Sequence, residues 1–156
     1  MEEGILFNRE KVIKNKWGKP HLKGYPKLYF NISHCEGAVA LGISNIAPVG
    51  IDIEKIVKFR PYALNRCFSD FEKKLVLDSS YPEKEFFKLW TLKESYIKAL
   101  GMGMSYPMKN ITFNIEDNVI KSNRSKCRFI LLEDSKNYLT SCCYGVGKAI
   151  SHGTVY

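Results

Sequence analysis

The chain is organised around residues 86–104, which read FFKLWTLKESYIKALGMGM. The large apolar residues of this stretch recur at helical spacing and form one stripe: Phe86, Leu89, Trp90, Ile97 and Leu100. Glu83 and Glu85 follow Pro82, where the first turn of a helix favours negative charge. Gly101 comes directly after the last apolar position, as is typical of a helix end. The pattern therefore predicts one long helix that ends at Leu100.

Three charged residues lie inside this predicted helix: Lys93, Glu94 and Lys98. Glu94 and Lys98 are four positions apart, so they share a face with the rings of Phe87 and Trp90. A carboxylate and an amine beside aromatic rings suit a site that handles phosphate. The same spacing also fits a solvated ion pair on a surface helix, which contributes little stability. Lys93 is expected either to face solvent or to pair with a carboxylate.

The composition restricts the class of protein. The chain has 156 residues, of which 45% are hydrophobic, enough for the core of one domain or of two closely packed halves. Lys and Arg number 24 against 16 Asp and Glu, a net charge of +8 that attracts polyanions. No apolar run reaches about 18 residues, and the first residues do not resemble a signal peptide. A cytoplasmic protein without a membrane segment is expected.

The cysteines and histidines do not form a metal-ligand pattern. The five cysteines contain no Cys-x-x-Cys pair, and the three histidines are scattered. An odd number of cysteines also argues against a disulfide framework. Reduced and mostly buried thiols are expected.

Alternating apolar residues and turn residues predict the other elements. They are strands at 27–33, 38–44 and 49–54, helices at 62–68 and 69–77, and strands at 110–116, 119–121, 127–133 and 138–146. Ser69 and Glu72 stand three apart, which is typical of a capping box at the start of the second helix. Antiparallel strands packed with helices indicate an α+β fold.

The strand at 49–54 contains the second informative motif, GIDIE at residues 50–54. Residues two apart on a strand point to the same side, so Asp52 and Glu54 project together while Ile51 and Ile53 pack on the other face. Two neighbouring carboxylates repel each other unless a cation or a proton lies between them. Magnesium prefers such oxygen ligands. The alternative is a strand with one wet face, on which both carboxylates are solvated.

Four motifs in a fixed order strengthen the functional interpretation. They are FNISH at 30–34, GIDIE at 50–54, FS at 68–69 and WTLKESYIK at 90–98. Together they resemble the 4′-phosphopantetheinyl transferase superfamily, and specifically its Sfp-like branch. The resemblance extends from about Trp17 to about Met104.

The resemblance implies an activity and a set of site residues. The family transfers the 4′-phosphopantetheine arm of coenzyme A to a serine of an apo carrier protein, with magnesium. Metal-ligand positions of the family correspond to Asp52, Glu54 and Glu94, and Glu94 and Lys98 correspond to catalytic positions. Coenzyme A-binding positions correspond to Lys19, Ser33, His34 and Lys98. The excess of basic residues also agrees with coenzyme A and an acidic carrier protein as partners.

The resemblance also implies a division of the chain. Residues 1–48 would form a partial N-terminal half with a strand hairpin on the coenzyme A side. Residues 49–156 would form a C-terminal half with the metal-binding carboxylates and the long helix. Because the first half is shorter than in the Sfp-like branch, the chain is expected to self-associate, to pair with another chain or to be a weak enzyme.

Two other functions compete with the transferase. The first is a catalytically weak or inactive relative that binds coenzyme A or a carrier protein. The second is a basic nucleic-acid-binding protein, but the sequence contains no motif of that class. We therefore expect no nucleic-acid partner.

Overall fold

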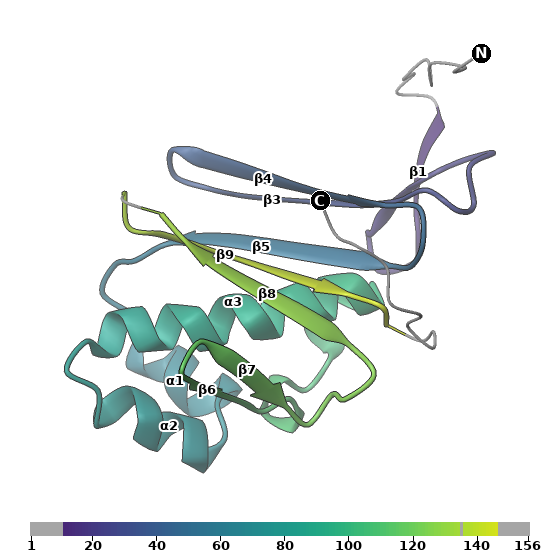
Figure 1. Ribbon diagram of the computed structural model, residues 1–156. Helices are drawn as coiled ribbons and strands as arrows, with labels where there is room; N and C mark the ends of the chain where they lie inside the picture. The colour runs from purple at the N-terminus through teal and green to yellow at the C-terminus, as the bar shows by residue number, and fades with distance from the viewer. Residues whose placement is uncertain (1–10, 135, 147–156) are drawn as a thin grey trace.

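The computed structural model describes residues 11–134 and 136–146 of the chain (Figure 1). The strands are β1 (Val12–Lys14), β2 (Pro20–Leu22), β3 (Tyr29–Cys35), β4 (Ala38–Ser44), β5 (Val49–Lys55), β6 (Phe113–Glu116), β7 (Val119–Ser122), β8 (Arg128–Glu133) and β9 (Tyr138–Tyr144). The α-helices are α1 (Pro61–Cys67), α2 (Asp70–Leu77) and α3 (Pro82–Leu100), and the short 3₁₀ segments are η2 (Gly103–Ser105) and η3 (Met108–Asn110). The predicted halves also include residues 1–10 and 147–156, which lie outside this description.

The elements are arranged in layers (Figure 1). Strands β5, β9 and β8 form an antiparallel sheet in that order. The hairpin of β3 and β4 packs against one side of β5, where a Cβ atom at Gly42 would lie 3.2 Å from the side chain of Val49 and 3.5 Å from that of Ile51. Helix α3 packs against the other face of β5 and against β9. The described residues therefore form an α+β fold with antiparallel strands and three α-helices, as predicted.

Helix α3 has the predicted boundaries, and its ends have the predicted chemistry. Pro82 is its first residue, and Gly101 ends it in the left-handed conformation with φ of 70°. Gly50 of β5 determines how closely the helix approaches the sheet. A Cβ atom at Gly50 would lie 2.0 Å from the carbonyl oxygen of Ser95 and 2.2 Å from the main-chain nitrogen of Ala99. Only glycine permits this contact between strand and helix.

Other predicted boundaries were shifted or missed. Strand β3 continues through His34 to Cys35, because a two-residue loop with Gly37 at φ of 80° turns the chain only there. Strand β2 was not predicted. The strand predicted from residue 110 begins only at Phe113, because 3₁₀ segment η3 occupies the residues before it. The capping box of Ser69 and Glu72 is confirmed.

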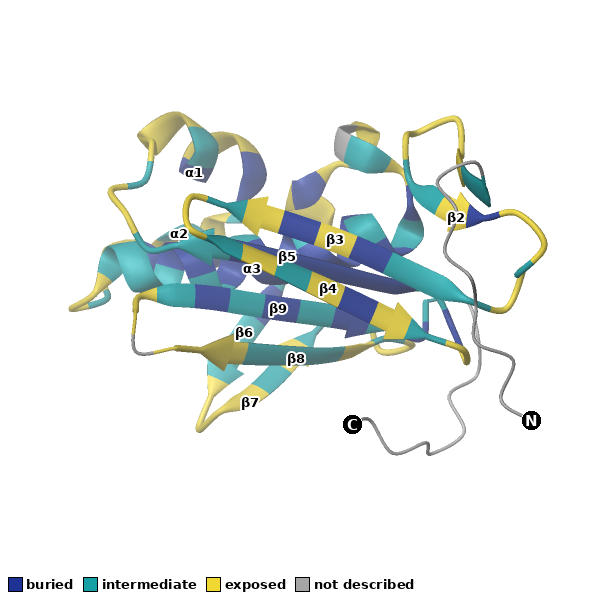
Figure 2. Ribbon diagram, turned by 90° about the horizontal axis from the view of Figure 1, so that it is seen from above, coloured by how far each residue is buried: buried dark blue, intermediate teal, exposed yellow. Residues whose placement is uncertain are grey.

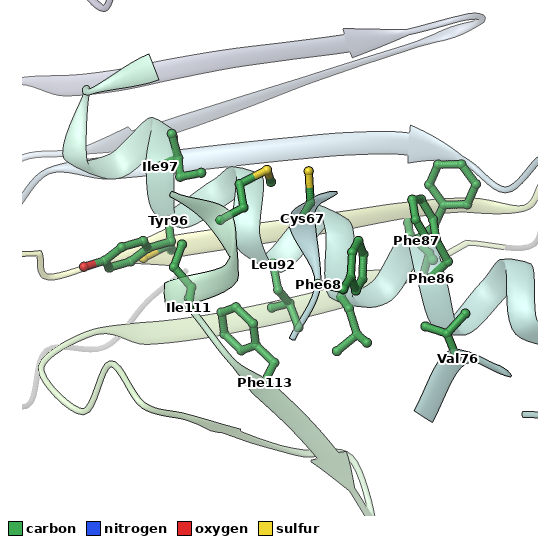
Figure 3. Close-up of a cluster of buried hydrophobic side chains, with 14 of the residues drawn as sticks. Cys67, Phe68, Val76, Phe86, Phe87, Leu92, Tyr96, Ile97, Ile111 and Phe113 are labelled. Atoms are coloured by element: carbon green, nitrogen blue, oxygen red, sulfur yellow. The ribbon is translucent and has the colours of Figure 1, made fainter. Parts of the chain in front are cut away.

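The main core lies between α3, the sheet and the smaller elements around them (Figure 3). Aromatic rings stack within it: the ring centroid of Phe86 lies 4.6 Å from that of Phe59 and 4.9 Å from that of Phe68.

Among the described residues, no helix is long and apolar enough to cross a membrane. From above, β3 and β4 alternate between covered and exposed residues (Figure 2), so the hairpin has an inner and an outer face.

A fully buried ion pair joins α2 to α3. The Nζ atom of Lys93 lies 2.8 Å from Oε2 of Glu72, and both side chains are 0% exposed. Lys93 also donates to the carbonyls of Met108, at 3.0 Å, and Ile111. The other oxygen of Glu72 accepts from the main-chain N–H of Phe113 at 3.0 Å. The prediction that Lys93 pairs with a carboxylate is confirmed, and its alternative of a solvent-facing lysine is wrong.

The substitution Lys93→Met is expected to lower the free energy of unfolding by about 3–5 kcal/mol, because it leaves the Glu72 carboxylate buried without its cation. Urea denaturation measures this change. The double variant Lys93→Met/Glu72→Gln should recover part of the loss. Lys84→Met is the control. It removes the partly exposed ion pair between Lys84, on the same helix, and Glu133, and it is expected to lower the free energy of unfolding by less than about 1 kcal/mol. Equal losses in Lys93→Met and Lys84→Met would contradict the prediction.

Candidate active site

Three polar side chains from three different elements meet between the hairpin, the sheet and the long helix. Nζ of Lys98, on α3, lies 2.6 Å from Oδ1 of Asp52, on β5. The same Nζ lies 2.8 Å from Oγ of Ser33, on β3, and this hydroxyl donates to Oδ1 of Asp52 at 3.0 Å. The structure thus brings together a predicted metal ligand, a predicted coenzyme A ligand and a predicted catalytic lysine.

Strand β3 is attached to β5 through side chains. Oδ1 of Asn31 accepts from the N–H of Ile51 at 2.8 Å, and Oγ of Ser33 accepts from the N–H of Ile53 at 3.3 Å. These bonds satisfy main-chain groups on the edge of β5 that does not pair with β9. Asn31 had no predicted role. Its place two residues before Ser33 on a strand was the sequence signal that both side chains face the same way.

Asp52 is almost completely buried, with 3% of the residue exposed. Burial raises the pKa of its carboxyl group, while Lys98 and Ser33 oppose that rise. The alternative of a solvated carboxylate on a wet strand face is therefore wrong for Asp52. Its second oxygen, Oδ2, is buried and has no hydrogen-bond partner among the described residues. An unpartnered buried carboxylate oxygen requires a ligand or a proton, because desolvation of a bare charge is costly.

Glu54 and Glu94 lie close enough to Asp52 for their charges to interact. Burial raises the pKa of Glu54, and the charge of Asp52 raises it further. Burial raises the pKa of Glu94 to about 7, with the charges of Asp52 and Glu54 adding to the effect and Lys98 opposing it. Three carboxylates thus share one partly desolvated region with the ammonium group of Lys98.

The carboxylates have the chemistry of a site for a hard divalent cation, since Mg²⁺ binds oxygen ligands. In the described part of the chain, however, no three Asp, Glu, His or Cys side chains are already gathered as a metal-ligand group. The ammonium of Lys98 is the cation that contacts Asp52. The free Oδ2 of Asp52 and the mutual repulsion of the carboxylates are the observations that fit a bound metal.

The structure places Lys19 and His34 differently from this group. Nζ of Lys19 donates to the carbonyls of Val49, at 3.0 Å, and Ala99, at 2.9 Å, and burial lowers the pKa of the lysine to about 8. It also lines a cavity of about 390 Å³ between β2, the start of β3 and the end of α3. His34 lies on the exposed side of β3, whereas its neighbour Ser33 points toward β5.

The raised pKa of Glu94 predicts how the stability of the metal-free protein depends on pH. The folded state keeps a proton on Glu94 up to about pH 7, whereas the unfolded state releases it near the ordinary value of 4.5. The folded state therefore binds more protons between these values, and its stability falls as the pH rises from 4.5 to 7. The contribution of Glu94 to this fall is at most about 3 kcal/mol.

Chemical denaturation in a chelating buffer at several pH values measures this fall. Glu94→Gln should make the decline shallower. Glu83→Gln, on the first turn of the same helix, should leave the slope unchanged. The assignment would be contradicted if the stability of the wild type rose over this pH range and Glu94→Gln showed the same dependence on pH.

Known proteins resemble this chain in sequence and in fold. The family model of the 4′-phosphopantetheinyl transferase superfamily matches residues 48–145. The 4′-phosphopantetheinyl transferase gsp of Aneurinibacillus migulanus is 38% identical over 148 residues, which cover 90% of this chain and 59% of that protein. The 4′-phosphopantetheinyl transferase Sfp of Bacillus subtilis is 29% identical, over 82% of this chain and 60% of the relative.

Among solved structures, the holo-[acyl-carrier-protein] synthase of Thermotoga maritima has a similar fold, with a TM-score of 0.54 and 18% identity. The similarity covers 64% of this chain and 63% of that one. The chain spans about three fifths of the length of the two curated relatives. The matched residues include β5, with Asp52 and Glu54, and all of α3, with Glu94 and Lys98. The chain belongs to the 4′-phosphopantetheinyl transferase superfamily.

Proposed function

We propose that the chain transfers the 4′-phosphopantetheine arm of coenzyme A to a serine of an acidic apo carrier protein. The observation that supports this best is the convergence of Ser33, Asp52 and Lys98, with Glu54 and Glu94 beside them. These are the residues at which the sequence resemblance expects metal and substrate contacts. Membership of the superfamily supports the same reaction.

The reaction forms a bond between the serine oxygen and the β-phosphorus of coenzyme A. It breaks the bond from that phosphorus to the oxygen of the departing adenosine 3′,5′-bisphosphate. Such a transfer requires orientation and neutralisation of charge more than covalent catalysis. The ammonium of Lys98, already held beside Ser33, is suited to bind a phosphate oxygen. Lys98 would then exchange part of its contact with Asp52 for the substrate.

Glu94 is the group proposed to accept the serine proton. In the metal-free protein, Glu94 has a pKa of about 7, so it is a stronger base than an ordinary glutamate and is still partly ionised near neutral pH. Asp52, Glu54 and Glu94 are the residues that would hold Mg²⁺. When bound, Mg²⁺ would supply positive charge to the pyrophosphate as a Lewis acid.

The remaining contacts to coenzyme A are also part of the proposal. Lys19 lines the 390 Å³ cavity together with aromatic side chains, and this volume can hold part of a nucleotide. The ammonium of Lys19 would organise this cavity through the two carbonyls that it binds. His34, exposed beside Ser33, is proposed to contact a phosphate group.

A cytoplasmic location is supported by the five cysteines, all of which are free.

The decisive experiment is intact-mass analysis of an apo carrier protein incubated with this chain, coenzyme A and Mg²⁺. We expect a gain of one phosphopantetheine, and a loss of at least about a hundredfold in rate for Asp52→Asn and Glu94→Gln. Glu83→Gln is the matched control and should keep the wild-type rate. Tight binding of coenzyme A by a folded protein that transfers nothing to fatty-acid or peptide-synthetase carriers would instead favour the binding-only relative.

A second prediction tests the metal site without using activity. Mg²⁺ should raise the thermal midpoint of the wild type, since a ligand that binds only the folded state stabilises it. Asp52→Asn should lose most of this increase, while Glu83→Gln should retain it. Differential scanning calorimetry with and without a chelator measures both. An equal increase in wild type and Asp52→Asn would remove Asp52 from the proposed ligand set.

A further inference from the structure

The connection between β7 and β8 (Figure 1) borders a pocket with basic and neutral polar side chains. The pocket has a volume of about 310 Å³, and its lining includes Asn118, Ser122, Arg124, Ser125 and Arg128. No Asp or Glu lies among the described residues that line it. Two guanidinium charges therefore border one hollow in the surface, where like charges repel each other unless an anion lies between them.

Contacts within the fold hold the guanidinium group of Arg124 in place. Its Nη2 atom donates to Oη of Tyr106 at 2.9 Å and to the carbonyl of Asn110 at 2.7 Å. The group also lies over the rings of Tyr96 and Tyr106, at 5.7 and 6.0 Å from their centroids. The main-chain N–H of Arg124 donates to Oγ of Ser122 at 3.1 Å, which shapes the connection itself. The positive charge thus has a fixed position before any ligand binds.

All of these partners are neutral, so they leave the charge of Arg124 without a counter-ion. Among the described residues, neither Arg124 nor Arg128 forms an ion pair. The Nε atom of Arg124 is buried and has no hydrogen-bond partner in the same part of the chain. A partly buried cation without an anion and a buried donor without an acceptor both cost free energy. An anion in the pocket would remove the first cost, and a small shift of the guanidinium group toward that anion would remove the second.

We propose that this pocket binds a phosphate-type oxyanion, either free phosphate or the phosphate group of a small ester. Such a group carries a charge of about −1.5 to −2 at neutral pH, which matches two guanidinium groups. Its oxygens can accept from guanidinium, hydroxyl and amide donors at the same time, and this lining provides all three kinds. A carboxylate has one charge and two oxygens, so it would leave part of the lining without a partner.

The pocket is separate from the catalytic group. It shares no lining residue with the 390 Å³ cavity that contains Lys19. Tyr96, which Arg124 covers, comes two positions after Glu94 on α3, and two positions correspond to about 200° around a helix. Glu94 and Tyr96 therefore point to nearly opposite sides of α3. The anion bound here is distinct from the phosphate groups proposed to contact Lys98, and the inference does not depend on the proposed transferase activity.

Isothermal titration calorimetry of the full chain with inorganic phosphate, in a chelating buffer of constant ionic strength, tests the proposal. The wild type should bind phosphate saturably. Arg124→Gln should weaken this binding by at least about tenfold, because charge-assisted hydrogen bonds are lost. Arg128→Gln should weaken it by about two- to fivefold, because Arg128 is exposed.

Arg66→Gln is the matched control. Arg66 also donates to a tyrosine hydroxyl, that of Tyr62 at 2.8 Å, and lies over the same ring, but it does not line the pocket. This variant should bind phosphate like the wild type. Repeating the titration with O-phosphoserine distinguishes the two sources of the anion. Tighter binding of O-phosphoserine assigns the pocket to a phosphate ester, and tighter binding of inorganic phosphate assigns it to the free anion.

A second measurement requires no variant. The signal of the Arg124 Nε–H group in a proton–nitrogen NMR spectrum of the unmodified chain should shift saturably as phosphate is added. This measurement and Arg128→Gln keep the test valid if Arg124→Gln is destabilised by the loss of its bonds to Tyr106 and Asn110. Circular dichroism checks that each variant is folded.

Other results would overturn the proposal. A wild type without saturable binding of phosphate or of O-phosphoserine shows that the pocket has no such ligand. Equal weakening by Arg124→Gln and Arg66→Gln indicates a general attraction of anions to the basic surface. Binding that is lost in Lys98→Met and kept in Arg124→Gln assigns the anion to the catalytic group.

Discussion

The direct contact of α3 with β5 at Gly50 is the constraint on which the site depends. The main chains of helix and strand approach so closely there that no other residue fits without movement. From this contact, Asp52 and Glu54 continue along the strand, while Lys98 and Glu94 lie along the helix. The geometry of the charged group is therefore fixed by a glycine without functional atoms. The rest of the fold keeps these two main chains in place.

Features that depend on local sequence could be predicted. Periodic apolar residues, Pro82 and Gly101 defined α3, because these signals act within one or two turns of the helix. The capping box of Ser69 and Glu72 was predicted for the same reason. The proximity of Asp52 to Lys98 followed only from the family resemblance, because no local rule joins residues 46 positions apart.

Features that depend on distant partners could not be predicted. Complete burial of Lys93 requires Glu72 and two main-chain carbonyls from the segment after α3. Asn31 has a role only because the unpaired edge of β5 lies beside it. Lys19 was expected to bind coenzyme A, and its bonds to the carbonyls of Val49 and Ala99 were not foreseeable. In each case, tertiary contact determines the role of an otherwise ordinary polar residue.

The bonds from Asn31 and Ser33 to β5 have a consequence for the evolution of the chain. A main-chain ladder between strands tolerates almost any side chain, but a joint made by side chains requires a hydrogen-bond acceptor of the right length at each position. Selection should therefore keep a short polar acceptor at residues 31 and 33. Residues 30 and 32, whose side chains face the other side of the hairpin, carry no such requirement. Alternating positions of one strand are therefore under different selective constraints.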